Sequence, residues 1–293
     1  MDTSGRMRVS EVLKAITKNT ILIYASAPSY PHGTIDPIEE LARIALRYSF
    51  CLHVDACLGG FVLPFARHLK SISIPNFDFQ IEGVTTISVD THKYGCAQKG
   101  SSVLLYHSNI LRQYQYTSVT DWSGGLYISP SQPGSRSGGL IAQTWAALLY
   151  NGYNGYQSAA HKILLASKYF REQISNIPGL ELLGADVTMV VAWAAKNPKL
   201  NIYMINDILS SMGWELSVLH APPALHLCIT SANIGSLPSL IADLRASVAD
   251  SFEHQNNSSS GMAPIYGLGN ALPDRNLVGE MLKEIQDILL HNS

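Results

Sequence analysis

A chain of 293 residues is long enough for two ordinary domains with a substantial apolar core. The net charge is −2 and Lys and Arg are scattered along the sequence, which excludes a basic nucleic-acid surface and a polybasic membrane patch. Charged residues make up 14% of the chain, against about 25% in an average protein, so we expect part of the surface to lie against another subunit.

The first part of the chain alternates between predicted helices and strands. Apolar residues at helical spacing predict a helix over residues 9–18, and residues 20–26 predict a buried strand. Asp36 and Pro37 open the next predicted helix, with Asp36 as its N-cap and Pro37 at the first helical position. A strand that ends at Asp55 follows, so the segment predicts a parallel β–α–β unit.

Two more strands, over residues 85–89 and 101–106, extend the predicted sheet. A loop rich in Gly, Ser and Pro then covers residues 123–139. Loops of this length in compact domains usually carry function or are disordered, and we expect this one to be functional.

A long helix is predicted over residues 140–177, with an interruption at Gly152 and Gly155. The fold class is therefore α/β, with a large domain over residues 1–155 that holds a mostly parallel sheet, and a smaller α+β domain over residues 156–293. The second domain is predicted to contain strands and helices over residues 188–195, 202–212, 225–229 and 237–252, a polar linker over 255–260 and a final helix over 277–290.

The cysteines show neither a CxxC pair nor a zinc-type spacing with histidine, so we expect reduced thiols in the cytoplasm. No apolar run approaches the roughly 18–20 residues of a membrane span. The first residues lack the apolar core of a signal peptide, and we expect the chain as given to be soluble. The four cysteines are Cys51, Cys57, Cys96 and Cys228.

Two ionisable residues stand where predicted strands end. Asp55 ends one strand, and Lys93 follows the next strand by a few residues. In open α/β sheets, ligands bind outside the carboxyl ends of the strands. A carboxylate and an amine placed there suit pyridoxal phosphate, because the amine forms a Schiff base with the aldehyde and the acid pairs with the pyridinium nitrogen. Taken singly, Asp55 could instead be a helix cap or an ion-pair partner, and Lys93 a solvated surface charge.

The pairing of Asp55 with a pyridinium nitrogen would be strong. Two unit charges about 4 Å apart interact by about 4 kcal/mol at an effective dielectric near 20. That energy corresponds to roughly three pKa units, enough to keep the ring nitrogen protonated at neutral pH. We expect Lys93 to be partly desolvated, with a lowered pKa that makes its amine nucleophilic.

Three neighbouring residues are secondary candidates. His92 could donate to a cofactor phosphate or could be an ordinary core histidine. Lys99 could offer a second positive charge to a phosphorylated substrate or could be a lysine in a hairpin turn. His53 lies two residues before Asp55 on the same strand face, so we expect it to support the site or the core and not to react.

Together these segments resemble the sphingosine-1-phosphate lyases of the group II pyridoxal-phosphate-dependent decarboxylase family. The likeness extends almost from one end of the chain to the other, and the matching sequence segments favour the lyases over the amino-acid decarboxylases. The matching stretches include Tyr30-Pro31-His32-Gly33-Thr34-Ile35-Asp36-Pro37, His53-Val54-Asp55-Ala56-Cys57-Leu58-Gly59-Gly60, Asp90-Thr91-His92-Lys93-Tyr94-Gly95, Lys99-Gly100-Ser101-Ser102, Gly134-Ser135-Arg136 and Ile265-Tyr266-Gly267.

The resemblance implies a fold-type I enzyme that works as a homodimer with active sites at the interface. Lys93 matches the Schiff-base lysine, and Asp55 matches the acid on the ring nitrogen. His92 matches a phosphate-side contact, and Lys99 a lysine near the substrate phosphate. Tyr127 and Ser135, in the glycine-rich loop, match positions that reach into the neighbouring subunit's site. There Ser135 would contact both the cofactor and the substrate, and Tyr127 would contact the substrate.

The implied reaction is retro-aldol cleavage of sphingosine 1-phosphate and related phosphorylated long-chain bases, in sphingolipid catabolism, to a fatty aldehyde and phosphoethanolamine. Family members carry a long stretch before the point that matches the start of this chain, with a membrane anchor in the endoplasmic reticulum in eukaryotic forms. We therefore expect a fragment with reduced activity or none by itself. Two alternatives remain: an amino-acid decarboxylase, and a non-catalytic dimerisation partner of a full-length lyase.

Overall fold

The computed structural model describes residues 1–2, 4–253, 263, 266–267, 272 and 274–291, and the predicted linker over 255–260 lies outside them. The chain folds into two compact units. The first contains Met1–Arg171, Leu183–Val191 and Cys228–Ile234, and the second contains the rest. The division between the compact units, after Arg171, lies later in the chain than the predicted domain boundary at 155/156, which falls inside the helix over residues 138–175. The division into functional domains at 155/156 stays a prediction.

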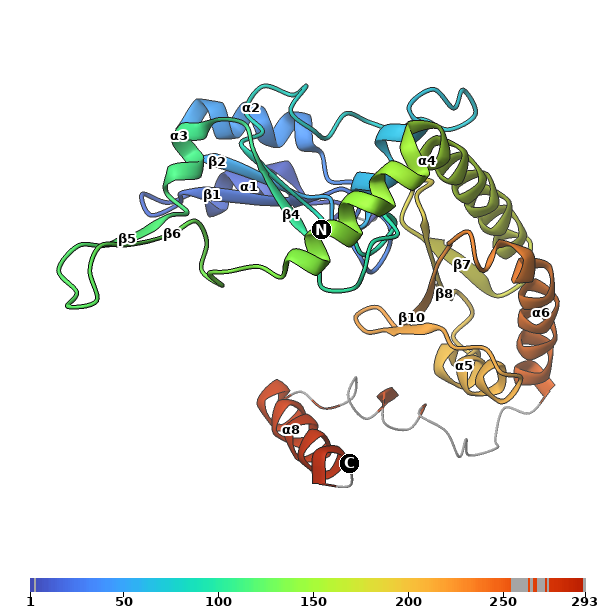
Figure 1. Ribbon diagram of the computed structural model, residues 1–293. Coiled ribbons are helices and arrows are strands. Elements are labelled where there is room, and N and C mark those ends of the chain that lie inside the picture. The colour runs from blue at the N-terminus through green and yellow to red at the C-terminus, as the bar shows by residue number, and fades with distance from the viewer. Residues whose placement is uncertain (3, 254–262, 264–265, 268–271, 273, 292–293) are drawn as a thin grey trace. The chain divides into compact units, whose positions relative to one another are not determined.

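A four-stranded sheet organises the first unit. It consists of β1 (Leu22–Ser26), β2 (Cys51–Asp55), β3 (Thr86–Val89) and β4 (Val103–Tyr106), in that spatial order. β1, β2 and β3 run parallel, as predicted, whereas β4 is antiparallel to β3. The carboxyl ends of three neighbouring strands therefore meet at one edge of the sheet (Figure 1).

Among the described residues, β1 and β2 of this sheet are closed by packing on one face only. Side chains alternate between the two faces of a strand, and those of β1 and β2 are buried on the face toward α2 (Ile38–Tyr48). On the opposite face of β1, Leu22 is 45% exposed and Tyr24 is 54% exposed. The prediction of a buried first strand therefore holds for one face of β1 and is wrong for the other. The residues packed between α2 and the sheet include Ile23, Ala25, Ile38, Leu41, Ala45, Leu52 and Val54.

The predicted N-cap role of Asp36 was also wrong. Pro37 is the N-cap residue of α2, and no side chain caps this end. The Asp36 carboxylate accepts hydrogen bonds from the backbone N–H of Met7 and of Ser26, both at 2.9 Å. Asp36 therefore ties the N-terminal segment to the end of β1 and is not available to the helix.

Two segments of the first unit, the first helix and residues 123–139, differ from their predictions. The predicted helix over 9–18 forms as α1 (Val9–Ala15), which buries none of its residues. Residues 123–139 are not one long loop, because β6 (Tyr127–Ser129) pairs with β5 (Thr117–Val119) in an antiparallel hairpin. This hairpin follows α3 (Asn109–Gln113) and extends away from the four-stranded sheet (Figure 1).

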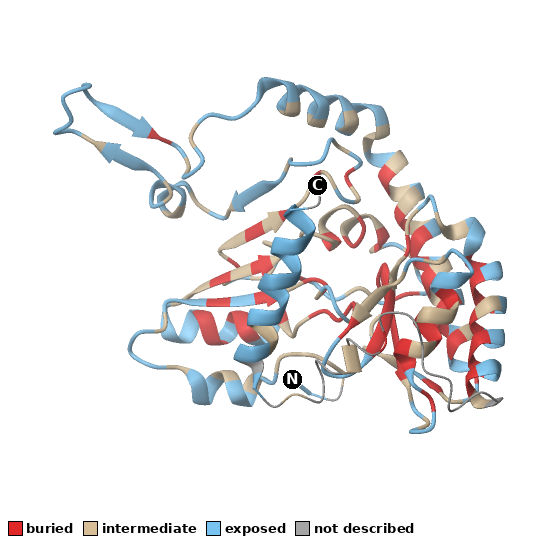
Figure 2. Ribbon diagram, turned by 90° about the horizontal axis from the view of Figure 1, so that it is seen from below, coloured by how far each residue is buried: buried red, intermediate tan, exposed pale blue. Residues whose placement is uncertain are grey.

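The long helix α4 (Gly138–Ser175) contains the predicted interruption. Gly152 has φ 58° and ψ −179°, a conformation open only to glycine, and it separates two helical halves. The half before Gly152 is largely exposed, as is the β5–β6 hairpin, whereas buried residues concentrate in the second half and in the strands (Figure 2).

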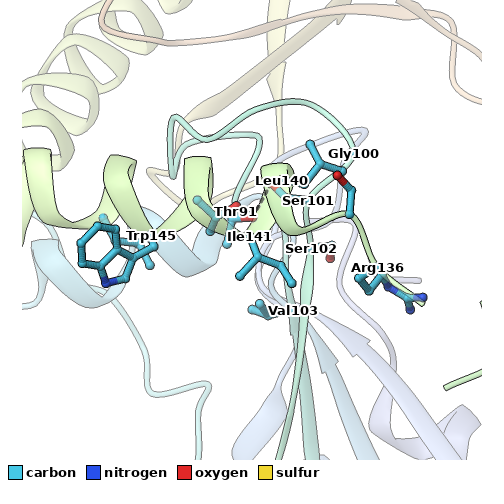
Figure 3. Close-up of a pocket in the computed structure, with 12 residues that line it drawn as sticks. Thr91, Gly100, Ser101, Ser102, Val103, Arg136, Leu140, Ile141 and Trp145 are labelled. Carbon is cyan, nitrogen blue, oxygen red and sulfur yellow. Dashed lines mark hydrogen bonds between the residues drawn. The ribbon is translucent and has the colours of Figure 1, made fainter. Parts of the chain in front are cut away.

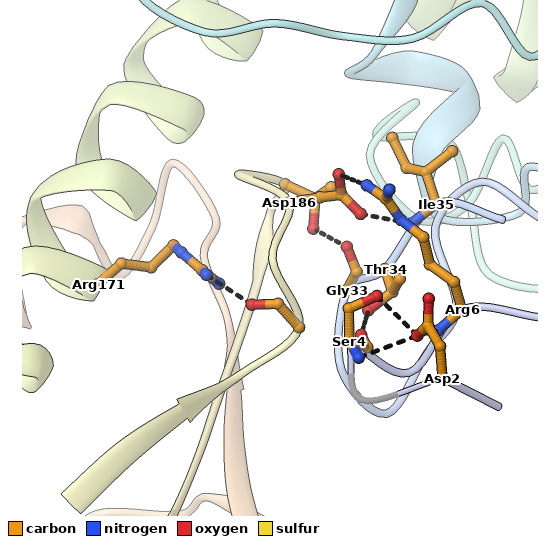
Figure 4. Close-up of polar contacts among 10 residues, drawn as sticks. Asp2, Ser4, Arg6, Gly33, Thr34, Ile35, Arg171 and Asp186 are labelled. Carbon is orange, nitrogen blue, oxygen red and sulfur yellow. Dashed lines mark hydrogen bonds and ion pairs between the residues drawn. The ribbon is translucent and has the colours of Figure 1, made fainter. Parts of the chain in front are cut away.

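A polar cluster explains why residues 183–191 belong to the first unit (Figure 4). Asp186 forms an ion pair with Arg6 and accepts a hydrogen bond from the backbone N–H of Ile35 at 3.0 Å. Arg171 donates to the carbonyl of Gly184 at 2.6 Å. Gly184 has φ 72°, and a Cβ there would lie 2.4 Å from the His32 carbonyl oxygen, so only glycine fits this approach.

The second unit is built on another four-stranded sheet. Its strands are β7 (Leu180–Leu183), β8 (Val190–Ala195), β10 (Ala224–Cys228) and β9 (Ser217–Leu219), in that spatial order. The helices are α5 (Ile202–Ser211), α6 (Leu237–Glu253) and α8 (Arg275–His291). β8, β10 and the three helices were predicted, whereas the short strands β7 and β9 were not. None of the helices among the described residues has the length and apolar character needed to cross a lipid bilayer.

Candidate active site

Asp55 and Lys93 lie at the ends of neighbouring parallel strands. Asp55 is the last residue of β2, where it pairs with Ser88 of β3. Lys93 lies in the turn over residues 90–95 that follows β3, and its side chain is 36% exposed. We call this turn the lysine turn. Tyr94 within it donates to the Ile229 carbonyl at 2.9 Å, which anchors residues 228–234 in the same unit.

The Asp55 carboxylate is half-buried and held by hydrogen bonds at both oxygens. Oδ1 accepts from the backbone N–H of Cys57 at 3.0 Å, and Oδ2 accepts from the Tyr24 hydroxyl at 2.7 Å. Burial alone raises the pKa of Asp55, but these hydrogen bonds outweigh it and the pKa lies below its usual value. Asp55 is therefore a carboxylate at neutral pH.

Lys93 is held by an acid that the sequence analysis did not single out. Its Nζ lies 2.9 Å from Asp90 Oδ2. Burial lowers the pKa of Lys93, but the hydrogen bond and charge of Asp90 outweigh it and raise the pKa above its usual value. The prediction of a lowered pKa for Lys93 was wrong, because it considered desolvation without the acid three residues earlier. Asp90 is in turn fixed by a 2.6 Å hydrogen bond from Ser102.

The Cys57 thiol lies near both carboxylates. It donates to Ser88 Oγ, 3.5 Å from its sulfur, and the charges of Asp55 and Asp90 both act on it. Burial is the main cause that raises the pKa of Cys57 to about 12, so the group stays a neutral thiol. The strand ends thus gather two carboxylates, one amine and one thiol in a single cluster.

His92 and Lys99 lie next to this cluster along the chain. His92 Nε2 is 3.5 Å from Asp90 Oδ2, and the backbone N–H of His92 donates to the Ser101 carbonyl at 3.3 Å. Lys99 is exposed and lies in the turn that leads toward β4. Its position is that of a hairpin-turn lysine, and its role toward a substrate phosphate stays a prediction.

Tyr127 and Ser135 lie on the hairpin and on the segment before α4. Tyr127 is 48% exposed, and its ring packs edge-on against Trp122 with centroids 6.3 Å apart. Ser135 is exposed. Among the described residues, no hydrogen bond or ion pair joins either of them to Asp55 or Lys93.

A groove adjoins the lysine turn (Figure 3). Its volume is about 330 Å³, and it runs between residues 100–103 and the first turns of α4. Thr91 of the lysine turn lies in its wall, where the Thr91 hydroxyl donates to Ser101 Oγ at 2.7 Å. Neither Asp55 nor Lys93 lines this groove. Its apolar side chains are Val103, Leu140, Ile141, Trp145 and Leu148.

The cluster offers suitable partners for two of the three functional groups of pyridoxal phosphate, the ring nitrogen and the aldehyde. A pyridinium nitrogen requires a carboxylate that stays ionised, which Asp55 provides. An aldehyde requires a primary amine, which Lys93 provides once its proton is released. His92, the predicted phosphate-side residue, lies within 3.5 Å of Asp90 Oδ2, the oxygen that also holds the Lys93 amine.

Comparison with known proteins identifies the class. Residues 1–196 match the pyridoxal-dependent decarboxylase conserved domain, so the chain belongs to this family, whose cofactor is pyridoxal phosphate. The predicted fold class is confirmed by solved structures. A glutamate decarboxylase from Lactobacillus brevis shares the fold with a TM-score of 0.70 at 19% identity, over 88% of this chain and 60% of that one.

Several relatives of higher identity are sphingosine-1-phosphate lyases. A sphingosine-1-phosphate lyase from Arabidopsis thaliana is 46% identical over 98% of this chain and 52% of that protein. The one from Saccharomyces cerevisiae is 37% identical over 98% of this chain and 49% of that protein. A solved structure of the Burkholderia pseudomallei sphingosine-1-phosphate lyase has a TM-score of 0.79 at 40% identity, over 86% of this chain and 56% of that one. The chain thus spans about half the length of the curated relatives it matches.

Proposed function

We propose that this chain supplies the lysine-bearing part of a pyridoxal-phosphate-dependent carbon–carbon lyase. Its substrates would be sphingosine 1-phosphate and related phosphorylated long-chain bases, and its products a fatty aldehyde and phosphoethanolamine. Identities of 37–47% to lyases of plants and yeast, over almost all of this chain, support this substrate class. The decarboxylase structures, at 18–19% identity, share the fold alone.

The observation that carries the proposal is the placement of Asp55 and Lys93 at and just beyond the carboxyl ends of adjacent parallel strands. Asp55 would hold the ring nitrogen, Lys93 the aldehyde carbon and His92 the phosphate, and Ser135 would also contact the cofactor. The bound cofactor would supply an electron sink for the carbon that bears the substrate amine, which weakens the neighbouring C2–C3 bond. Lys99, Tyr127 and Ser135 would contact the substrate.

Asp90 would hold the Lys93 amine in its protonated form before the cofactor binds. The amine attacks an aldehyde only when neutral, yet the Asp90 carboxylate 2.9 Å away favours the ammonium form. Because the pKa of Asp90 is lowered and that of Lys93 is raised, Asp90 stays ionised and the proton must leave Nζ for solvent before the amine attacks. Ser102, which donates to the other oxygen of Asp90, keeps this carboxylate oriented.

The proposed assembly is a homodimer with shared sites. Tyr127 and Ser135 would act in the site of the neighbouring subunit, which agrees with their exposure and with the absence, in the described part of the chain, of a hydrogen bond or ion pair to Asp55 or Lys93. The hairpin and the first half of α4 also expose large apolar side chains that a second subunit could cover. They include Trp122, Leu126, Ile128, Ile141, Trp145 and Leu149.

Cofactor binding is the direct test. Purified chain titrated with pyridoxal phosphate should develop the absorbance of an imine, and Lys93→Ala should abolish it. Lys99→Ala is the matched control, because it removes a nearby lysine and should leave the absorbance unchanged. Equal loss in both variants, or no loss in Lys93→Ala, would contradict the assignment.

The reaction is tested by its products. We expect the isolated chain to bind the cofactor weakly and to turn over little, since it covers about half of each relative. Assays with sphingosine 1-phosphate should therefore include the chain mixed with an intact lyase whose hairpin residues are mutated. Restored aldehyde release would show that Tyr127 and Ser135 act across an interface, as in a non-catalytic partner. Release of carbon dioxide from an amino acid would instead establish a decarboxylase.

A further inference from the structure

The open face of the first sheet carries a connected row of polar and aromatic side chains around Asp55. Tyr24 on β1 pairs across the sheet with His53 on β2, which pairs with Thr86 on β3. All three lie on the same face as Asp55, which is two residues beyond His53. This row is separate from the lysine turn, and nothing in the proposed reaction uses it.

Each member of the row is fixed by its neighbour. The Tyr24 hydroxyl donates to Asp55 Oδ2 at 2.7 Å, and the Tyr24 ring packs on the His53 ring with centroids 4.8 Å apart. His53 Nδ1 lies 2.8 Å from Thr86 Oγ1, and His53 Nε2 lies 3.1 Å from Ser88 Oγ. Both nitrogens of the His53 ring are therefore engaged, which fixes the ring against which Tyr24 packs.

Tyr24 donates a hydrogen bond to Asp55 Oδ2, whereas the backbone donates to Oδ1. Cys57 N–H fixes Oδ1, and Ser88 Oγ approaches the same oxygen at 3.5 Å. Without Tyr24, Oδ2 would have no donor among the described residues and the carboxylate could rotate. A carboxylate offers about four lone-pair sites, so Oδ2 can accept from Tyr24 and still face a ring N–H.

We propose that Tyr24 is a positioning residue for Asp55, with His53 as the platform that orients its ring. This inference rests on the proposed function, in which Asp55 faces the ring nitrogen of pyridoxal phosphate. A phenol is suited to this task because it stays protonated: burial and the Asp55 charge raise the pKa of Tyr24 to about 12. The titratable groups that act on Asp55, besides Tyr24, are His53 on β2, whose pKa burial lowers, Lys93 in the lysine turn, and the neutral Cys57 thiol.

The test uses Tyr24→Phe, which removes one oxygen at a position that is 54% exposed and leaves the core unchanged. Tyr150→Phe is the matched control, because Tyr150 is 92% exposed and has no contact with Asp55. The first measurement follows isotope-labelled aspartate carboxyl groups by NMR in cofactor-free chain, with the Asp55 signal identified by its loss in Asp55→Asn. Tyr24→Phe should raise the titration midpoint of Asp55, and Tyr150→Phe should not.

The second measurement is affinity for pyridoxal phosphate, by the imine absorbance. Loss of one hydrogen bond to a half-buried carboxylate should weaken binding about three- to tenfold in Tyr24→Phe. An Asp55 midpoint unchanged in Tyr24→Phe would overturn the positioning role. So would unchanged affinity in a chain whose Lys93→Ala variant has lost binding, although the proposed function would then stand. A raised midpoint in a chain that binds no cofactor would support Tyr24 and count against the proposed function.

Discussion

Replacing Asp90 by Asn should make the Lys93 amine easier to deprotonate. The change preserves the shape of the side chain and its contact with Ser102 but removes the charge 2.9 Å from Lys93 Nζ. In the native chain this charge outweighs the burial of Lys93, so that its pKa is raised. Without it, burial opposes the charged form and the pKa should fall.

The size of the effect follows from the exposure of the pair. Lys93 is 36% exposed and Asp90 14%, so solvent screens much of their attraction. Exposed and partly exposed ion pairs contribute about 0.2–1 kcal/mol. The upper end corresponds to about a fivefold larger fraction of neutral Lys93 amine at a given pH.

The assay is NMR of lysines that carry isotope-labelled methyl groups, with the Lys93 signal identified by its absence in Lys93→Ala. Asp90→Asn should lower the titration midpoint of Lys93 and leave that of Lys99 unchanged. Asp78→Asn is a suitable control, since it removes an acid paired with Arg67 in the same unit, at 2.8 Å. If the Lys93 midpoint stays the same or rises in Asp90→Asn, Asp90 is not the group that raises the pKa of Lys93.

Three further predictions concern stability. Asp55→Asn should lower the free energy of unfolding by about 1 kcal/mol at neutral pH. Because the folded pKa of Asp55 is depressed, this difference should be present above the unfolded value of about 3.9 and be lost as the pH falls through the folded value. Gly152→Ala should destabilise the chain by about 1–3 kcal/mol, whereas Gly155→Ala, in regular helix, should be neutral or stabilising. Asp186→Asn should leave Arg6 without its ion pair and speed proteolysis near the N-terminus.

Thermal unfolding decides the first two of these, and limited proteolysis the third. An Asp55→Asn difference that persists unchanged at low pH would show that the carboxylate charge is not what stabilises the fold. Equal effects of alanine at the two glycines would show that α4 tolerates a side chain at its interruption. Unchanged cleavage in Asp186→Asn would show that other contacts hold the N-terminal segment.

The parallel part of the first sheet was predictable because its strands are continuous apolar or β-branched runs separated by an amphipathic helix. The hairpin of β5 and β6 was not, since strands of only three residues give no periodic signal. β7 and β9 were missed for the same reason of length. Gly152 was predictable as an interruption because glycine is a recognisable break in a helical pattern.

The site was predictable in part. Asp55 and Lys93 stood out because they follow strands, and parallel strands bring such residues to one edge. Asp90 was hidden by its place in the same short motif as Lys93, although an acid three residues before a lysine is a possible partner in a turn. Tyr24 could not have been assigned, because its hydrogen bond depends on the pairing of β1 with β2 and on which face of the sheet stays open.

Borohydride reduction of the chain with bound pyridoxal phosphate, followed by peptide mapping, identifies the lysine that holds the cofactor. We predict a label on Lys93, reduced in Asp55→Asn and retained in Lys99→Ala. A label spread over exposed lysines, or one on Lys93 that is indifferent to Asp55, would contradict this prediction.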